Sequence, residues 1–367
     1  MKPDVIIVGG GVIGSACAHF LSRAKVKVLV LEQKHIASGS SGAAAALISE
    51  ASSSVTPGPL RDFACQSRRM VRTLEGELET SIEVMADGSL AVALTEEEAE
   101  TLRNRFESMS RFEQGCSLLT GSEARTLEPY LSPGAQAAIL NPNNYHVNPF
   151  RLCQGYIRSA LRRGARLLCG TTVRGFKVTG GHIDRIVTDR GDFQAGRVVV
   201  AGGVRTPEIL SGLGVAVPVE PVRGQVIITD AAPAVIRHFL FFFGHHYIKQ
   251  TAAGNFYLGS HLERVGFDTR VTIEKLRAYA QTFAGALPVL SGLRIIHAFA
   301  GLRPMSADGL PIIGPLPGIP HLIVATGHCA DGIRDSAATG KAVSELIVSG
   351  KTEMPLDAFR VERFQRG

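Results

Sequence analysis

Short apolar runs alternate with segments of helical periodicity along most of the chain. Apolar, β-branched runs without polar alternation are typical of strands that are buried on both faces of a parallel sheet. Such runs lie at residues 5–8, 27–31, 197–201 and 322–325, near the beginning, middle and end of the chain. We therefore expect one buried sheet that is assembled from segments far apart in the sequence.

Further strands are expected at residues 166–178, 183–188, 219–229, 239–250 and 256–260, with a hairpin at 83–94 around Asp87-Gly88. The strands between 219 and 260 favour a second, more antiparallel sheet. Helical patterns are expected at residues 12–22, 60–79, 96–113, 149–163, 273–283 and 332–349.

The first strand runs directly into a glycine-rich turn, Gly9-Gly10-Gly11-Val12-Ile13-Gly14, which fits G-x-G-x-x-G. In this motif Gly9 permits a tight turn, Gly11 lets the backbone approach a pyrophosphate, and Gly14 lets the helix pack on the strand. Glu32 ends the second strand, 18 residues after Gly14, where an acid accepts hydrogen bonds from ribose hydroxyls. The order of strand, glycines, helix, strand and acid predicts a dinucleotide site, and it does not distinguish NAD from FAD.

The interleaving of the two groups of strands predicts an α/β plus α+β fold with two discontinuous domains. A Rossmann-like dinucleotide-binding domain is expected to comprise residues 1–80, 145–218 and 302–367. A substrate domain on a mixed, largely antiparallel sheet is expected to comprise residues 81–144 and 219–301. A chain of 367 residues is long enough for two such domains.

Composition argues against several other classes of protein. The formal net charge is +6, but Lys and Arg are scattered, so we expect no nucleic-acid partner. The six cysteines lack C-x-x-C spacing, which predicts reduced thiols with neither a disulfide framework nor a metal site. The apolar patch at 239–243 is too short to cross a bilayer, and the first strand begins too early for a signal peptide. We therefore expect a cytoplasmic protein without a transmembrane segment.

Several motifs follow one another over the full length of the chain. They are GGGVIG (9–14) with Glu32, SGSSGAAAAL (38–47), YHVNP (145–149), VVVAGG (198–203), PVRGQ (221–225), YIKQ (247–250), AGLRPMSADGLPIIG (300–314) and ATGHCADGI (325–333). With these motifs the chain resembles the FAD-dependent D-amino acid oxidase family, and within it the glycine and sarcosine oxidase branch, which includes secondary-amine oxidases such as iminodiacetate oxidase.

The resemblance implies a FAD enzyme that oxidises the C–N bond of a small amino acid. A hydride equivalent would pass from the carbon beside the amine to flavin N5, and water would hydrolyse the resulting imine. Gly301 stands where covalently flavinylated sarcosine oxidases carry a cysteine, so FAD is expected to be noncovalent. The expected FAD-binding residues are Gly9, Gly11, Val12, Ile13, Gly14, Glu32, Gln33, Ser40, Ser41, Ala44, Val173, Ala201, Gly202, Gly224, Arg303, Gly327, Asp331, Gly332 and Ile333.

Four residues are the expected catalytic residues: Arg303, Tyr247, Lys249 and His245. Arg303 stands at the carboxylate-binding position of the family, where a guanidinium grips a carboxylate through two parallel hydrogen bonds. Tyr247 matches the tyrosine that faces the substrate carboxylate in glycine oxidases. Alternation on a strand would put His245, Tyr247 and Lys249 on one face, which would offer a second positive group to a dicarboxylate. Polar residues on an exposed strand face would show the same pattern.

Two departures from the family bear on the substrate. Ala330 stands where glycine oxidases have a second arginine, and Phe299 stands near the usual tryptophan. Both departures argue against unsubstituted glycine and favour a larger N-substituent. The helix that begins near Gly332 is expected to point its free N–H groups at flavin N1 and the C2 carbonyl, where the reduced ring is negative.

Three functions stay open at this point. The favoured one is oxidation of an N-substituted glycine such as sarcosine or iminodiacetate, with oxygen or a partner protein as electron acceptor. An alternative is the flavin subunit of a heteromeric dehydrogenase of opines, hydroxyproline or D-amino acids. The third is a non-catalytic flavoprotein subunit. An oligomer is possible in each case.

Overall fold

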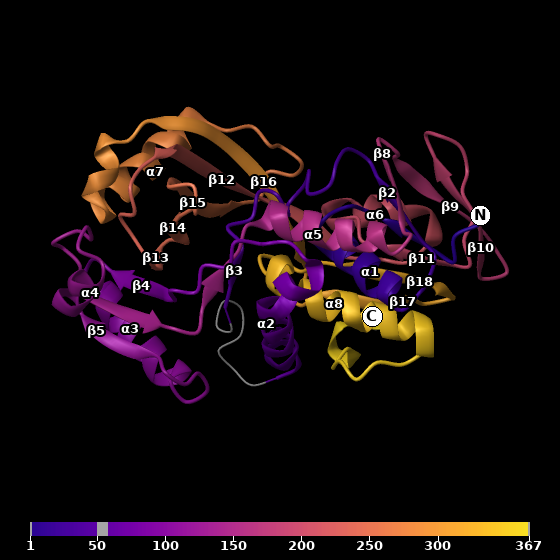
Figure 1. The fold of residues 1–367 in the computed structure, drawn as a ribbon, viewed down its shortest axis with the longest axis horizontal. Helices are drawn as coiled ribbons and strands as arrows, with labels where there is room; N and C mark the ends of the chain where they lie inside the picture. The colour runs from indigo at the N-terminus through magenta and orange to yellow at the C-terminus, as the bar shows by residue number, and fades with distance from the viewer. Residues whose placement is uncertain (1, 50–57, 366–367) are drawn as a thin grey trace.

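The computed structural model describes residues 2–49 and 58–365, with only the backbone at 260 and 261. Two large sheets lie side by side along the long axis of the molecule (Figure 1). The six-stranded sheet has the order β17-β18-β11-β1-β2-β8. Its strands are β1 (Val5–Val8), β2 (Val28–Glu32), β8 (Arg166–Cys169), β11 (Arg197–Val200), β17 (Ile312–Leu316) and β18 (Ile319–Thr326). All neighbours are parallel except β17 and β18, so this sheet is the Rossmann-like part of the fold.

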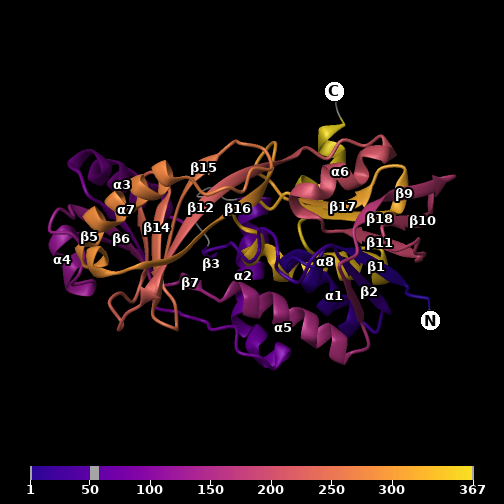
Figure 2. The same cartoon turned by 90° about the horizontal axis from the view of Figure 1, so that it is seen from above.

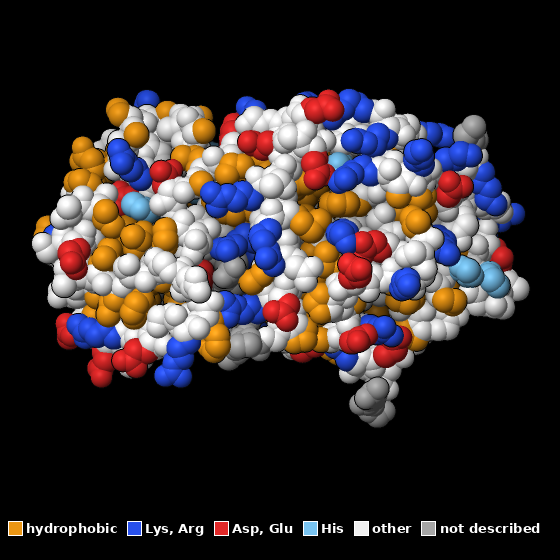
Figure 3. Space-filling view, turned by 60° about the horizontal axis from the view of Figure 1, so that its bottom comes forward, with side chains coloured by type: hydrophobic (Ala, Val, Ile, Leu, Met, Phe, Trp, Pro, Cys, Tyr) orange, Lys and Arg blue, Asp and Glu red, His pale blue; other side chains and the backbone are white. Residues whose placement is uncertain are grey.

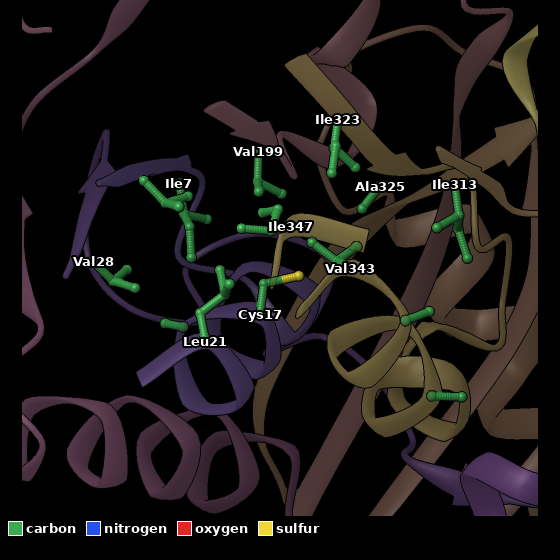
Figure 4. Packing of buried hydrophobic residues seen from close by; sticks show 14 of the residues in the cluster. Ile7, Cys17, Leu21, Val28, Val199, Ile313, Ile323, Ala325, Val343 and Ile347 are labelled. Carbon is green, nitrogen blue, oxygen red and sulfur yellow. The ribbon is translucent and has the colours of Figure 1, made fainter. Parts of the chain in front are cut away.

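Both faces of the six-stranded sheet are covered. On one face α1 (Val12–Arg23) and α8 (Gly332–Ser349) pack against side chains such as Ile7, Val199 and Ile323 (Figure 4). Outside them, α5 (Pro149–Arg162) packs on α1, and α2 (Pro59–Leu78) packs on α8. The other face is covered by the hairpin of β9 (Val173–Thr179) and β10 (His182–Thr188) and by α6 (Thr206–Leu210). Burial on both faces explains why these strands are apolar without alternation.

The eight-stranded sheet has the order β16-β12-β15-β14-β13-β4-β6-β5. Its strands are β4 (Ser89–Ala93), β5 (Ser117–Thr120), β6 (Ala137–Asn141), β12 (Val219–Ala231), β13 (Phe239–Phe242), β14 (His246–Gln250), β15 (Asn255–Glu263) and β16 (Ile295–Ser306). Only β13 and β4 are parallel neighbours, so the sheet is mixed and largely antiparallel. This sheet confirms the α+β part of the predicted fold.

Three helices pack on the eight-stranded sheet: α3 (Glu96–Met109), α4 (Gly121–Leu127) and α7 (Ile273–Ala286). The long strands β12 and β16 extend from this sheet toward the six-stranded sheet (Figure 2). A short pair, β3 (Leu47–Ile48) with β7 (Tyr145–His146), adds a second connection between the halves of the molecule. The groups carried by β12 and β16 can therefore reach the half of the molecule that contains the six-stranded sheet, which we call the cofactor half because the sequence predicts the dinucleotide there.

Three local predictions were wrong. The hairpin at 83–94 does not form, because β4 pairs with β13 and β6 and buries its apolar side chains there. The run at 166–178 splits at Gly170, whose φ is +66°, into β8 and β9 in different sheets. The run at 239–250 folds back at Gly244 and His245, with φ of +77° and +62°, into β13 and β14. The partners of β4 and the separate sheets of β8 and β9 are set by distant segments, whereas β13 and β14 form a local hairpin around Gly244 and His245.

The surface carries charged side chains of both signs. On the face drawn in Figure 3, Lys and Arg side chains are spread widely, with Asp and Glu among them. Among the helices that the structure describes, none is both long enough and apolar enough to cross a membrane. Within residues 2–49 and 58–365, no group of three His, Cys, Asp or Glu side chains is placed to hold a metal ion.

Candidate active site

A cavity of about 1480 Å³ lies between the two sheets. Its walls are formed by the carboxyl ends of β1, β2 and β11, by the N-terminal ends of α1 and α8, and by side chains of β12, β13, β14 and β16. Ligand sites for one small molecule usually enclose roughly 300–1,000 Å³. The cavity is therefore large enough for a dinucleotide together with a small substrate.

The glycine-rich turn between β1 and α1 forms one end of the cavity. Gly9 has a φ of +111°, and a Cβ built there would lie 2.4 Å from the carbonyl oxygen of Ala201. A Cβ on Gly14 would lie 2.0 Å from the carbonyl oxygen of Gly9, so Gly14 packs beneath the turn and does not line the cavity. Gly11 is the N-cap of α1 and adds no side-chain cap, while Ser41 Oγ accepts a 2.9 Å hydrogen bond from Val12 N.

Glu32 is a buried acid at the end of β2. Its carboxylate accepts hydrogen bonds from the backbone N–H of Gly10 at 2.7 Å and of Lys34 at 2.8 Å. The side chain also lines the cavity, as do Gln33 and Val173. Glu32 thus fixes the glycine turn and presents its charge where the sequence predicts a ribose.

The N-terminal end of α8 enters the same cavity from the other side. Asp331 is its N-cap and makes no side-chain cap hydrogen bond, and Gly332 and Ile333 line the cavity. The first backbone N–H groups of a helix have no intrahelical partner, and they carry the positive end of the helix dipole. An electronegative group bound beside Gly332 is therefore stabilised.

Two buried polar residues support the start of α8, and of the two only His328 lines the cavity. Arg334 forms ion pairs with Asp331 at 3.2 Å and with Asp335 at 2.7 Å. His328 Nε2 lies 3.0 Å from Thr339 Oγ1, and burial lowers the pKa of this imidazole to about 3. His328 is therefore neutral at physiological pH and acts as a hydrogen-bonding residue.

Arg303 and Tyr247 meet on one face of the eight-stranded sheet because two neighbouring strands carry glycine there. A Cβ on Gly224 of β12 would lie 2.0 Å from Arg303 Nη1, and a Cβ on Gly259 of β15 would lie 2.0 Å from Tyr247 Cζ. Both side chains therefore lie across bare backbone and line the cavity. Burial raises the pKa of Tyr247, which the nearby Arg303 guanidinium partly offsets, so the phenol stays protonated as a donor.

His245 and Lys249 are placed differently from Arg303 and Tyr247. His245 lies in the turn before β14 with a φ of +62°, so strand alternation does not apply to it, although it lines the cavity. Lys249 is on β14, but its Nζ donates a 2.6 Å hydrogen bond to the carbonyl oxygen of Ala45. Lys249 is not among the cavity-lining residues.

The expected FAD-binding residues line the cavity, apart from Gly14 and Gly327. Ala330 also lines it, at the place where the resemblance leads one to expect an arginine. Sequence reasoning missed the aromatic wall that Phe239 and Phe241 form with Phe299 and Tyr247. The alternation Phe239, Phe241 was visible in the sequence, but only the pairing of β13 with β14 brings it beside Tyr247.

Comparison with known proteins places the chain in a family. The family model described as FAD dependent oxidoreductase matches residues 4–346. The chain belongs to this family, and it is therefore an oxidoreductase that uses FAD.

Several individual members of the family are similar to this chain over almost its whole length. Glycine oxidase from Geobacillus kaustophilus is 30% identical, over 98% of this chain and 97% of the relative. The crystal structure of the Geobacillus kaustophilus glycine oxidase superposes with a TM-score of 0.94, at 29% identity and 99% coverage of both chains. L-proline dehydrogenase from P. horikoshii superposes with a TM-score of 0.90, at 28% identity, covering 100% of this chain and 98% of the other. Hydrogen cyanide synthase subunit HcnC from Pseudomonas protegens is 28% identical, over 98% of this chain and 96% of the relative.

The cavity fits FAD. Two helix N-termini enter it whose N-cap residues, Gly11 and Asp331, make no side-chain cap hydrogen bond, which suits a pyrophosphate at α1 and an electron-rich ring edge at α8. Backbone at Gly11 and Gly202 lies open to it, and Glu32 faces it at the end of β2. These residues would hold the dinucleotide along the edge of the six-stranded sheet, and Arg303 and Tyr247 stand beyond it on the eight-stranded sheet.

Proposed function

We propose that the enzyme oxidises the C–N bond of a small secondary amino acid, an N-substituted glycine such as sarcosine or iminodiacetate. The observation that carries the proposal is the convergence of Arg303 and Tyr247 on the wall of the cavity that α8 enters. FAD, when bound noncovalently, supplies the hydride acceptor. Arg303 grips the substrate carboxylate through two hydrogen bonds, and the protonated Tyr247 phenol donates a third. Ala330 leaves room for the N-substituent.

The relatives support this choice of substrate class. L-proline dehydrogenase is named for an amino acid whose nitrogen is a secondary amine, and glycine oxidase is named for the unsubstituted parent of the proposed substrates. A neutral amine needs no strong base for hydride transfer, which agrees with a neutral His328. The electron acceptor in this proposal is oxygen or a partner protein.

A second candidate rests on a different observation. The HcnC relative is named as a subunit of hydrogen cyanide synthase, and the match spans 96% of its length. The chain would then be the flavin subunit of a heteromeric dehydrogenase of opines, hydroxyproline or D-amino acids, and it would pass electrons to a partner chain.

Anaerobic mixing with a panel of amino acids distinguishes the two proposed functions. The purified protein is mixed with sarcosine, iminodiacetate, glycine, D-proline, hydroxyproline or an opine, and the loss of the oxidised flavin band near 450 nm is followed. Bleaching by the N-substituted glycines supports the first proposal. Bleaching by the opine or by hydroxyproline alone supports the second, and bleaching by none removes the first.

Noncovalent attachment has its own test. Among the described residues that line the cavity, Cys329 is the one cysteine, and its Sγ lies 3.5 Å from Ser306 Oγ. We expect acid precipitation to release all the flavin into the supernatant. Flavin that stays on the polypeptide would contradict this expectation.

A further inference from the structure

The side-chain amine of Lys249 is buried and has no role in the chemistry proposed above. Only 4% of Lys249 is exposed, and its Nζ donates to Ala45 O at 2.6 Å. Nζ also lies 5.4 Å from the ring centroid of Tyr257, on the neighbouring strand β15. Burying an amine is costly unless it is hydrogen-bonded, and the Ala45 carbonyl supplies the acceptor.

Tyr257 reaches the same stretch of chain as Lys249. Its hydroxyl donates a 2.6 Å hydrogen bond to the carbonyl oxygen of Ala43. Strand β16 contacts the same loop. The carbonyl oxygen of its residue Leu302 accepts a hydrogen bond from Ser40 Oγ, and a Cβ built on Gly301 would lie 2.4 Å from Ala43 Cβ. Three strands of the eight-stranded sheet therefore hold one loop of the cofactor half.

The loop does not take its shape from local preference. Ala46 has a φ of +60°, in the left-handed region that residues with a Cβ rarely adopt. Such a conformation persists only when the surroundings over-determine it. All four residues of 43–46, which we call the alanine segment, line the cavity. Any loosening of the segment therefore changes the cavity wall beside Gly301.

We propose that Lys249 and Tyr257 are positioning residues that hold the alanine segment against the wall beside Gly301 and Arg303, and that Lys249 does not bind the substrate. Its amine is committed to a backbone carbonyl, so a dicarboxylate gains no partner from it. The claim about the segment is independent of the substrate, whereas the claim about binding rests on the proposed function.

The first test is hydrogen–deuterium exchange of the holoenzyme. Lys249→Met and Tyr257→Phe each remove one anchor, and we expect amides in residues 43–47 to exchange about tenfold faster, as in a locally opened segment. Lys249→Gln keeps a donor without the charge and should give a smaller change. The exposed Lys351→Met is the control and should give none. Unchanged exchange in both Lys249→Met and Tyr257→Phe would overturn the proposal.

The second test asks whether Lys249 touches the substrate. A positioning role predicts that Lys249→Met raises the KM for sarcosine and for iminodiacetate by the same factor, with about a tenfold change and a smaller change in kcat. It also predicts a shifted flavin absorption band in Lys249→Met and Tyr257→Phe, because the segment lies at the cavity wall. A loss confined to iminodiacetate would make Lys249 a substrate ligand and refute the second half of the proposal. If no amino acid bleaches the flavin, the proposed function fails while the exchange experiment still judges the segment.

Discussion

The two ends of the cavity are built in different ways. At the cofactor end, the glycine turn, α1 and Glu32 belong to one continuous β-α-β unit, and hydrogen bonds within that unit set its shape. At the substrate end, Arg303 and Tyr247 come from different strands and meet over the bare backbone of Gly224 and Gly259. One substitution in the β-α-β unit is therefore expected to disturb cofactor binding as a whole. At the substrate end, Arg303 and Tyr247 depend on the pairing of the strands and can be disturbed separately.

The largest expected effect is at the cofactor end. Gly9→Ala places a Cβ 2.4 Å from the Ala201 carbonyl oxygen in a backbone with φ of +111°. Strain at such a residue costs about 1–3 kcal/mol before the clash is counted, so we expect FAD affinity to fall at least a hundredfold. The ratio of flavin to protein absorbance after gel filtration measures the loss. Gly285→Ala, at a site with no atom near the new Cβ, is the matched control. A Gly9→Ala variant that keeps its flavin would show that the turn tolerates a side chain at this position and would contradict the prediction.

The next effect is at the substrate end. Arg303→Lys keeps the charge but loses the two-point grip, and breaking a desolvated charge pair costs on the order of 2–5 kcal/mol. We expect a large rise in the substrate concentration that half-saturates flavin reduction, with FAD content unchanged. Arg294→Lys, at an exposed ion pair with Asp230, serves as the control. If half-saturation stays the same, the carboxylate anchor lies elsewhere.

A smaller effect is expected from Glu32→Gln. The amide can still accept from Gly10 N but no longer offers a charged acceptor, and hydrogen bonds to charged groups contribute about 1.5–3 kcal/mol. FAD titration of the apoprotein should show a dissociation constant raised roughly tenfold. Substrate half-saturation of the reloaded enzyme should stay the same. A change in substrate binding alone would contradict the separation of the two ends.

The last expected effect is on stability and not on ligand binding: a pH dependence of the free energy of unfolding at Lys249. Burial lowers the pKa of its amine from 10.5 to about 7. Between these two values the unfolded chain binds the proton and the folded chain does not, so the free energy of unfolding rises with pH. At most, the slope is about 1.4 kcal/mol per pH unit. Denaturant midpoints of the wild type and Lys249→Met are compared at pH 7 and pH 9, and the wild type should gain stability relative to the variant as the pH rises. Parallel curves would mean that the amine keeps its proton.

The β-α-β unit at the cofactor end was predictable from the sequence, because β1, the glycine turn, α1 and Glu32 are neighbours along the chain. The helix at 332–349 and the strand at 5–8 were confirmed to the residue. The substrate end was predictable only through the resemblance, since nothing local indicates that Gly259 makes room for Tyr247. Lys249 shows the limit most clearly. Alternation places it on the face of Tyr247, but its amine reaches Ala45, 204 residues earlier in the chain.

The strand order of the six-stranded sheet has a consequence for synthesis on the ribosome. β1 and β2 are complete by Glu32. β11, which pairs with β1, ends at Val200, and β18, which pairs with the other edge of β11, ends only at Thr326. The helix that closes the cavity from the far side, α8, follows β18. A nascent chain therefore carries its nucleotide-binding turn long before the wall that completes the site is made, and the whole cavity can form only after α8 has been synthesised.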